Sequence, residues 1–250
     1  MSLGQVGYRF TFGRQVIYVD PYLSDSVAQI DGPAFERLFP VLISPEKVTD
    51  ANWVLITHEH IDHCDPLTLG PLAKASPQAR FICPSGVKAK LQGLNISEKR
   101  IVTPVEGEWN EMGISLKVAA VPAAHPDINR DELGYPRCLG FVIDYEGRRL
   151  YHAGDTSPHE EVLRAVKGLG PIDIAFLPVN ERNFFRDRMG IIGNMSVREA
   201  FLVAQEIGAK SLVPMHWDMF NLNSVAREEI ELLYRLLAPQ FSLEFYPSQL

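Results

Sequence analysis

The most constraining feature of this chain is a short segment, residues 57–65, in which four potential metal ligands fall within six positions. They are His58, His60, Asp62 and His63. All four offer nitrogen or oxygen atoms, which suit Zn, Mn or Fe. The segment follows an apolar run of strand length and precedes Asp65-Pro66, a typical helix start. Burying these side chains together without a cation would be costly, so the spacing favours a metal site over a solvated polar loop.

Apolar runs of strand length recur throughout the chain, and turn residues are spread evenly between them. In residues 114–121, apolar and polar positions alternate with a period of two, which is typical of a half-buried strand. Glu146-Gly147-Arg148 lies between two such runs and predicts a hairpin. The predicted strands span residues 16–19, 53–57, 81–83, 114–121, 139–145, 150–153, 172–177, 211–215 and 243–246.

Capping patterns mark the helix starts. Beyond the one at Asp65, capping boxes are predicted at residues 157–160, with Pro158 at the first helical position, and at residues 196–199. Apolar side chains at helical spacing in residues 230–237 indicate the last helix. The strand-rich first half and the alternating second half predict an α+β fold. We expect a four-layer αββα sandwich, with two mixed sheets flanked by helices, as a single domain over residues 1–250.

Composition narrows the class of partners. The 250 residues include 24 Lys and Arg against 31 Asp and Glu, a net charge of −7, which argues against nucleic acid or an anionic membrane surface as a partner. Apolar runs stay short of the roughly 18–20 residues of a membrane span, and no signal-peptide pattern is visible. Cys64, Cys83 and Cys138 are typical of reduced thiols. We expect a cytoplasmic protein with a small-molecule substrate, and the sequence leaves a homo-oligomer open.

Three further metal ligands follow predicted strands: His125, Asp155 and His216. Strand ends that emerge on one edge of a sheet are where α/β folds commonly place sites. The full set predicts two divalent ions, Zn, Mn or Fe, about 3.5–4 Å apart, a spacing at which they can share a hydroxide. The first ion would bind His58, His60 and His125, and the second Asp62, His63 and His216, with Asp155 between them.

Other residues near these ligands have weaker signals. His152 lies within a predicted strand, which favours a structural histidine over a ligand. His159 lies in the first turn of a predicted helix, where it either contacts substrate or is solvated. Cys64 adjoins His63 but lacks the Cys-x-x-Cys spacing of a structural zinc site, so we expect it in the wall of the site.

The order of these motifs resembles that of the metallo-β-lactamase superfamily. The resemblance extends from about Leu3 to His216 and implies an αββα sandwich with a dinuclear site at one edge. The matching motifs are Leu3-Gly4-x-x-Gly7, Val19-Asp20-Pro21-Tyr22, His58-x-His60-x-Asp62-His63, His125, Gly154-Asp155-Thr156 and Pro214-Met215-His216. Residues 65–68, 75–81, 179–182 and 215–218 look most similar to the L-ascorbate-6-phosphate lactonase branch, whose members bind manganese or zinc and open a sugar lactone.

This resemblance implies metal-assisted hydrolysis of a lactone or ester of a small sugar-like metabolite, with or without a phosphate group. Two cations lower the pKa of a shared water molecule toward neutrality. Asp62, as a ligand that orients the water, and Asp155, between the ions, are the candidate catalytic residues. Asp20 would either hydrogen-bond a ligand imidazole or cap the Asp-Pro turn.

Candidate substrate-binding residues follow the predicted strand that ends near residue 179. Arg182, Arg186 and Arg188 would either bind a phosphate or form a solvated basic loop, and Arg182 lies nearest the strand end. Asn180 and Asn194 would donate hydrogen bonds to substrate or hold the loop.

Two other functions fit the same residues. A phosphodiesterase on this scaffold would share every metal ligand. A non-catalytic metal-binding or regulatory protein could also keep the fold, although all seven ligand positions are filled.

Overall fold

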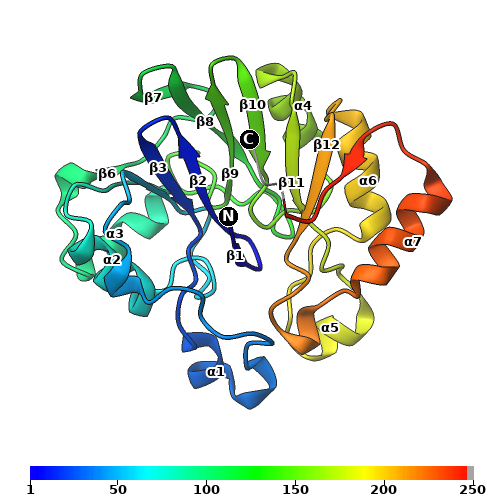
Figure 1. The fold of residues 1–250 in the computed structure, drawn as a ribbon, viewed down its shortest axis with the longest axis horizontal. Helices are drawn as coiled ribbons and strands as arrows, with labels where there is room; N and C mark the ends of the chain where they lie inside the picture. Colours follow the sequence, from blue (N-terminus) through cyan, green and yellow to red (C-terminus); the bar gives the residue numbers. More distant parts are fainter. Residues whose placement is uncertain (247–250) are drawn as a thin grey trace.

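Two β-sheets packed face to face form the centre of the computed structural model, which describes residues 1–246, and helices cover both outer faces (Figure 1). The predicted αββα arrangement of two mixed sheets is therefore confirmed. The first sheet keeps the order of the chain, with β1 to β3 antiparallel and β3 to β6 parallel. Its strands are β1 (Ser2–Gly4), β2 (Gly7–Phe12), β3 (Gln15–Val19), β4 (Trp53–Leu55), β5 (Arg80–Ile82) and β6 (Ile101–Val102).

The second sheet has the order β13-β12-β11-β10-β9-β8-β7. Strands β7 to β10 are antiparallel to their neighbours, and β10 to β13 run parallel. The strands are β7 (Trp109–Gly113), β8 (Leu116–Pro122), β9 (Leu139–Tyr145), β10 (Arg148–His152), β11 (Ile174–Pro178), β12 (Ser211–Met215) and β13 (Ser242–Leu243).

Side chains in the first sheet alternate between its two faces, as the pleat of a strand requires. Ile17 in β3 packs into the core between the sheets. Its neighbours Val16 and Tyr18 join the cluster that α2 (Pro66–Ala75) and α3 (Ser85–Gly93) cover. Both faces of this sheet are therefore buried.

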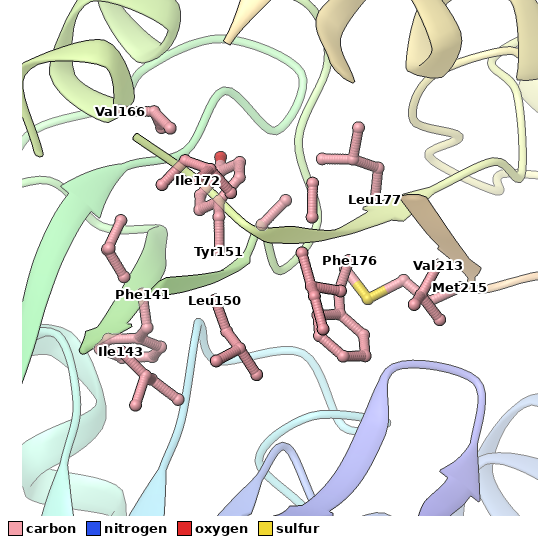
Figure 2. Packing of buried hydrophobic residues seen from close by; sticks show 14 of the residues in the cluster. Phe141, Ile143, Leu150, Tyr151, Val166, Ile172, Phe176, Leu177, Val213 and Met215 are labelled. Carbon is pink, nitrogen blue, oxygen red and sulfur yellow. The ribbon is translucent and has the colours of Figure 1, made fainter. Parts of the chain in front are cut away.

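The second sheet is buried in the same way. In β10, Leu150 points away from the outer helices, whereas Tyr151 lies on the side of Val166 in α4 (Glu160–Leu169) (Figure 2). Helices α6 (Val197–Glu206) and α7 (Arg227–Leu237) cover the rest of this outer face.

Two short helices lie away from these layers, at the lower edge of the view in Figure 1: α1 (Ser26–Asp31) and α5 (Phe184–Arg188). Short 3₁₀ turns span Pro33–Phe35, Pro45–Lys47, Glu98–Arg100 and Asn221–Asn223. Among residues 1–246, no helix has both the length and the apolar character that a bilayer crossing requires.

All nine predicted strands are present, although some bounds were wrong. The strand predicted from residue 114 starts at Leu116. Ile114 is 94% exposed and Ser115 has a φ of +56°, because these residues form the turn between β7 and β8. The strand predicted at residues 243–246 ends at Leu243, and Tyr246 is exposed.

The helix caps at Asp65 and Ser196 are confirmed, the latter as a full capping box with Glu199. The box predicted at residues 157–160 was wrong. Helix α4 begins at Glu160, and His159 caps it by accepting a hydrogen bond from the Glu161 N–H at 3.1 Å. Ser157 instead donates its backbone N–H to the Ala124 carbonyl, which ties this segment to the end of the second sheet.

Candidate metal centre

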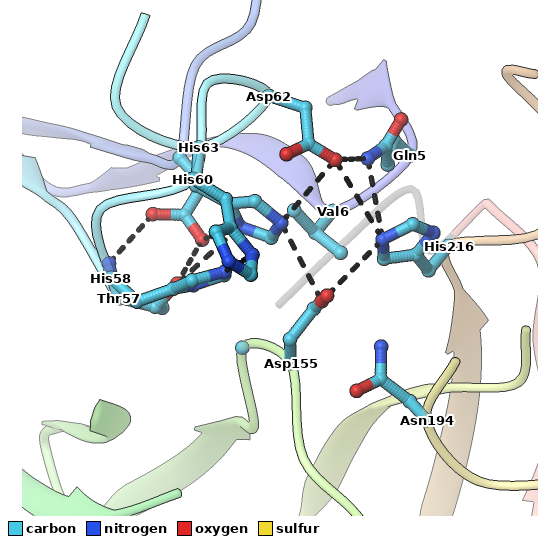
Figure 3. A network of polar contacts seen from close by, with 12 residues as sticks. Gln5, Val6, Thr57, His58, His60, Asp62, His63, Asp155, Asn194 and His216 are labelled. Carbon is cyan, nitrogen blue, oxygen red and sulfur yellow. Dashed lines mark hydrogen bonds and ion pairs between the residues drawn. The ribbon is translucent and has the colours of Figure 1, made fainter. Parts of the chain in front are cut away.

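The seven predicted metal ligands come together at one edge of the sandwich, where strands of both sheets end. Figure 3 labels all of them except His125. The loop after β4 contributes four of them, and the segments after β8, β10 and β12 contribute His125, Asp155 and His216. Strands β8, β10 and β12 run in the same direction, because β9 is antiparallel to both β8 and β10 and β10 to β12 are parallel, so the segments that follow them emerge at the same edge.

At three positions, a left-handed backbone conformation directs these segments toward the site. The φ angles are +61° at Gly154, +40° at Asp20 and +62° at His216. At Gly154, a Cβ atom would lie 2.8 Å from the Leu139 carbonyl oxygen. Only glycine therefore lets the chain pass between the two sheets just before Asp155. Asp and His are among the side chains that tolerate this backbone region best.

The ligands form three overlapping groups, and within each group the ligand atoms lie within 4.8 Å of one another. Two of the groups match the sets predicted for the two ions, and the third contains Asp155. The groups are His58–His60–His125, His58–His63–Asp155 and Asp62–His63–His216.

Asp155 stands between the two predicted sets. Its Oδ2 lies 3.3 Å from His216 Nε2 and 3.7 Å from His125 Nε2, and its Oδ1 lies 3.5 Å from His63 Nε2. The carboxylate therefore faces one histidine of the first set and two of the second, as a shared ligand would.

Two buried atoms show that a cation fits this arrangement. Within the described part of the chain, His63 Nε2 and Asp155 Oδ1 have no hydrogen-bond partner. Nitrogen ligands placed tetrahedrally about 2.0–2.1 Å from an ion stand about 3.4 Å apart. His60 Nδ1 lies 3.3 Å from His125 Nε2 and 2.9 Å from His58 Nε2. The donor types and their spacing thus suit divalent cations that take nitrogen and oxygen ligands.

His63 is oriented by Asp20, one of the two roles that the sequence left open for this aspartate. The Asp20 Oδ2 lies 2.7 Å from His63 Nδ1, and both side chains are fully buried. The other carboxylate oxygen accepts the Thr57 N–H at 2.8 Å. With Nδ1 donating to Asp20, the Nε2 atom of His63 is left to face the ligand cluster.

The charges in the site set the protonation of its groups. Burial lowers the pKa of His63, but Asp62, Asp155 and Asp20 outweigh burial and raise this pKa to about 10. Burial and the neighbouring His63 hold the pKa of His58 well below its usual range. Burial acts to raise the pKa of Asp155, yet His216 and His63 hold it well below the usual value. Asp155 is therefore a carboxylate at neutral pH.

His125 is oriented by a chain of amides. Its Nδ1 lies 3.0 Å from Asn194 Oδ1, Asn194 Nδ2 donates to Asn180 Oδ1 at 3.0 Å, and Asn180 Nδ2 donates to Asn223 Oδ1 at 3.1 Å. Asn180 and Asn194 are buried, and neither lines the cavity in front of the ligands. Of the two roles predicted for these asparagines, the geometry supports holding the loop, and through it His125.

The chain also places Gln5 in the site, a residue that the sequence analysis missed. Its side-chain amide donates to Asp62 Oδ2 and lies 3.3 Å from His216 Nε2. Gln5 and Val6 reach the ligands from the β1–β2 turn, and His152 anchors that turn because its Nε2 donates to the Val6 carbonyl at 2.8 Å. His152 is thus a structural histidine, as predicted.

For the three arginines after Asn180, the sequence left open either phosphate binding or a solvated basic loop, and the structure shows their contacts within the chain. Arg182 is 54% exposed, lies 3.8 Å from Asp187 and does not line the cavity. Arg186 is buried and donates to the backbone carbonyls of Glu181 and Ser224 at 2.6 and 2.7 Å. Arg188 lies over the ring of Phe184. Arg186 therefore holds the loop together.

The cysteines are free thiols. Cys64 is buried beside the site, and burial raises the pKa of its thiol to about 12. Among the described residues, the groups of clustered ligands include His and Asp side chains but not Cys64, in agreement with a place in the wall.

Two mixed sheets flanked by helices, with a cluster of histidines and aspartates at one edge, are typical of αββα proteins that bind metal ions at that edge. Within that class, residues 15–217 match the family model described as "Beta-lactamase superfamily domain", and the chain belongs to this superfamily.

Relatives and solved structures agree with this assignment. A "UPF0173 metal-dependent hydrolase" of Methanoregula boonei is 30% identical over 214 residues, which cover 80% of this chain and 86% of that protein. An "N-acyl-phosphatidylethanolamine-hydrolyzing phospholipase D 1" of Caenorhabditis elegans is 25% identical over 82% of this chain and 59% of its own length. A protein of Mycobacterium tuberculosis is 28% identical over 82% of this chain, and this chain spans only 55% of its length. The metallo hydrolase Igni18 of Ignicoccus hospitalis has the same fold, with a TM-score of 0.73 at 18% identity, over 98% of this chain and 93% of its own.

Proposed function

We propose that this chain is a metal-dependent hydrolase that holds two divalent cations, Zn or Mn, and cleaves a lactone or ester of a small metabolite. The observation that carries the proposal is the pair of ligand groups that face the shared carboxylate of Asp155. The similarity to proteins named metal-dependent hydrolases supports the same reaction class.

In this proposal, the histidines and aspartates divide between two ions. His58, His60 and His125 would hold one cation, and Asp62, His63 and His216 the other. Divalent cations bound there would supply Lewis acidity and a water molecule whose pKa lies near neutrality. Asp62 and Asp155 both line the cavity, where they can orient a water molecule and keep it facing the substrate. Asp20, Asn194 and Gln5 hold the ligands in place.

A phosphodiesterase is the second candidate. It is favoured by the similarity to the phospholipase D of Caenorhabditis elegans, and it would use the same ligands. The lactonase-like subtype rests on the resemblance of residues 65–68, 75–81, 179–182 and 215–218. A non-catalytic role is less well supported, because all seven ligand positions are filled.

Hydrolysis assays with the Zn- or Mn-loaded protein separate these functions. We expect turnover of p-nitrophenyl esters or of γ- and δ-lactones, at least tenfold above that of bis-p-nitrophenyl phosphate in kcat/KM. Chelation should abolish the activity and added metal should restore it. The reverse preference would establish the phosphodiesterase, and no turnover of any of these compounds by fully loaded protein would favour the non-catalytic alternative.

A further inference from the structure

The cavity in front of the metal ligands has one polar side and one apolar side. Its volume is about 430 Å³, within the range of about 300–1,000 Å³ that small-molecule sites occupy. The polar side consists of predicted metal ligands and Asn223. The apolar side comes from residues 27–35 around α1, from Ile61 in the loop after β4, from residues 189–192 after α5 and from the loop after β12. Its side chains are Val27, Phe35, Ile61, Met189, Ile191, Ile192 and Phe220.

Part of this apolar side is exposed to solvent. Met189 is 49% exposed and Ile192 is 44% exposed, and both line the same cavity. Single exposed apolar side chains are common, but several around one concave site indicate a binding surface. An apolar group that entered the cavity would cover these side chains together with Phe35.

The charges around the cavity disfavour an anionic substituent. Among the described residues that line it, none is Lys or Arg, and the only charged side chain apart from the metal ligands is Asp31, at the end of α1. The nearby Arg186 is engaged by backbone carbonyls, and Arg182 lies beside Asp187. A phosphate or carboxylate on the distant part of a substrate would therefore meet Asp31 without a cation to balance it.

We infer that the substrate is an uncharged small molecule whose scissile group lies at the metal ligands and whose alkyl or aryl group packs between the α1 segment and residues 189–192. The inference deepens the proposed hydrolase and rests on it. Of the two possibilities that the sequence left open, a substrate with or without a phosphate group, it favours the second, because Arg182 does not line the cavity. A volume of about 430 Å³ suits a chain of about six carbons beside the scissile group.

Binding of hydroxamates to the zinc-loaded protein tests this inference without turnover. Isothermal titration calorimetry would compare acetohydroxamate, hexanohydroxamate and adipic monohydroxamate, which has the length of hexanohydroxamate but ends in a carboxylate. Each buried methylene strengthens binding about fourfold, so we expect hexanohydroxamate to bind at least tenfold more tightly than acetohydroxamate. Adipic monohydroxamate should bind less than threefold more tightly than acetohydroxamate. Zinc content measured after each titration shows whether the metal was retained.

Two Ile→Asp variants provide a matched comparison. Ile192→Asp places a charge in the apolar wall and should remove most of the gain of hexanohydroxamate over acetohydroxamate. Ile114→Asp makes the same change in the β7–β8 turn, where Ile114 is 94% exposed, and should leave the gain intact. Asp31→Lys should strengthen binding of adipic monohydroxamate about two- to fivefold, the range of an exposed ion pair.

The outcomes separate this inference from the proposed function. Equal binding of the short and long hydroxamates, or tighter binding of the anionic one, would overturn the apolar-substrate inference even if esters are hydrolysed. A gain with chain length that Ile192→Asp removes would support it even if no ester tested in parallel is turned over, and in that case the proposed hydrolase alone would fail.

Discussion

The histidines His63 and His125 occupy corresponding places in the two halves of the site, but different partners hold them. His63 donates to the carboxylate of Asp20 at 2.7 Å, whereas His125 donates to the amide oxygen of Asn194 at 3.0 Å. Both arrangements fix the ring and direct Nε2 toward the ligand cluster. Only the first also places a negative charge behind the imidazole, which makes it a stronger electron donor to a cation.

The two halves should therefore bind their ions with different strength. The Asp62–His63–His216 group contains a carboxylate ligand and is supported by a second, buried carboxylate. The His58–His60–His125 group contains imidazoles and no carboxylate; the amide of Asn194 supports His125, and the Thr57 hydroxyl lies 3.0 Å from His58 Nδ1. We expect the first group to hold its ion more tightly and the second to exchange its ion more readily.

We expect the largest effect on metal binding from a substitution of Asp155, which lies between the two halves. Asp155→Ala removes a carboxylate that faces histidines of both groups, so we expect fewer than one ion per chain and loss of hydrolysis. His60→Ala, which touches one group only, should retain about one ion. Elemental analysis after gel filtration measures both, with far-UV circular dichroism as a check on folding. If Asp155→Ala kept two ions, Asp155 would not be a shared ligand.

Removing the charge behind His63 should weaken one ion selectively. Asp20→Asn preserves the size of the side chain and an oxygen that faces His63, but it loses the negative charge. Such changes behind a metal ligand typically lower affinity about 10–100-fold. Competition with a fluorescent chelator should show this loss for the tighter ion, with a smaller loss for the weaker ion, because Asp20 reaches His58 only through the Thr57 hydroxyl. A uniform loss for both ions would mean that Asp20 acts on the fold rather than on His63.

Asp20 should also affect how the stability of the metal-free protein depends on pH. The pKa of His63, raised to about 10, lies above the ordinary value of about 6.5. Protonated His63 therefore stabilises the fold fully below about pH 6.5, and this stabilisation is lost as the pH rises through about 10. Asp20→Asn should lower the free energy of unfolding relative to the unaltered protein, and this loss should be larger at pH 6 than at pH 10. We expect the difference to be about 1.5 kcal/mol, the lower end of the range for a hydrogen bond to a charged group. Urea denaturation in the presence of chelator measures it, and a deficit equal at both pH values would contradict the role of Asp20.

A substitution in the amides behind His125 should have the smallest effect on metal affinity. Asn194→Ala removes the hydrogen bond to His125 without removing a charge, so we expect a loss of at most about tenfold in affinity for the weaker ion. The affinity for the tighter ion and the pH profile of stability should match the unaltered protein. A loss above 100-fold would show that the amide chain matters as much as the carboxylate, and the contrast between the two halves would then disappear.

The sequence predicted which histidines and aspartates come together because the relevant signal is local. A strand followed by closely spaced donors fixes where His58 to His63 lie, and the other ligands each follow a strand of the same edge. The partners behind them were harder to predict. Asn194 meets His125 across 69 positions and Gln5 meets Asp62 across 57, and neither pair has a spacing that marks it.

The loop after β11 shows a different limit. Three arginines near a metal edge suggest phosphate binding, but their surroundings depend on how the backbone closes. Gly193 allows residues 181–182 to pack against it, since a Cβ there would lie 2.4 Å from the Glu181 carbonyl oxygen. That packing brings Asn194 to His125 and gives Arg186 its carbonyl partners. Gly193 permits this packing, but which residues meet there depends on the closed fold and cannot be read from the local sequence.

Anomalous diffraction from crystals of the zinc-loaded protein, recorded on either side of the zinc absorption edge, tests the central claim most directly. We predict two peaks per chain, one among His58, His60 and His125 and the other among Asp62, His63 and His216, with Asp155 in contact with both. The peak beside His63 should keep the higher occupancy when zinc is limiting. A single peak, or two peaks of which neither contacts Asp155, would contradict this account.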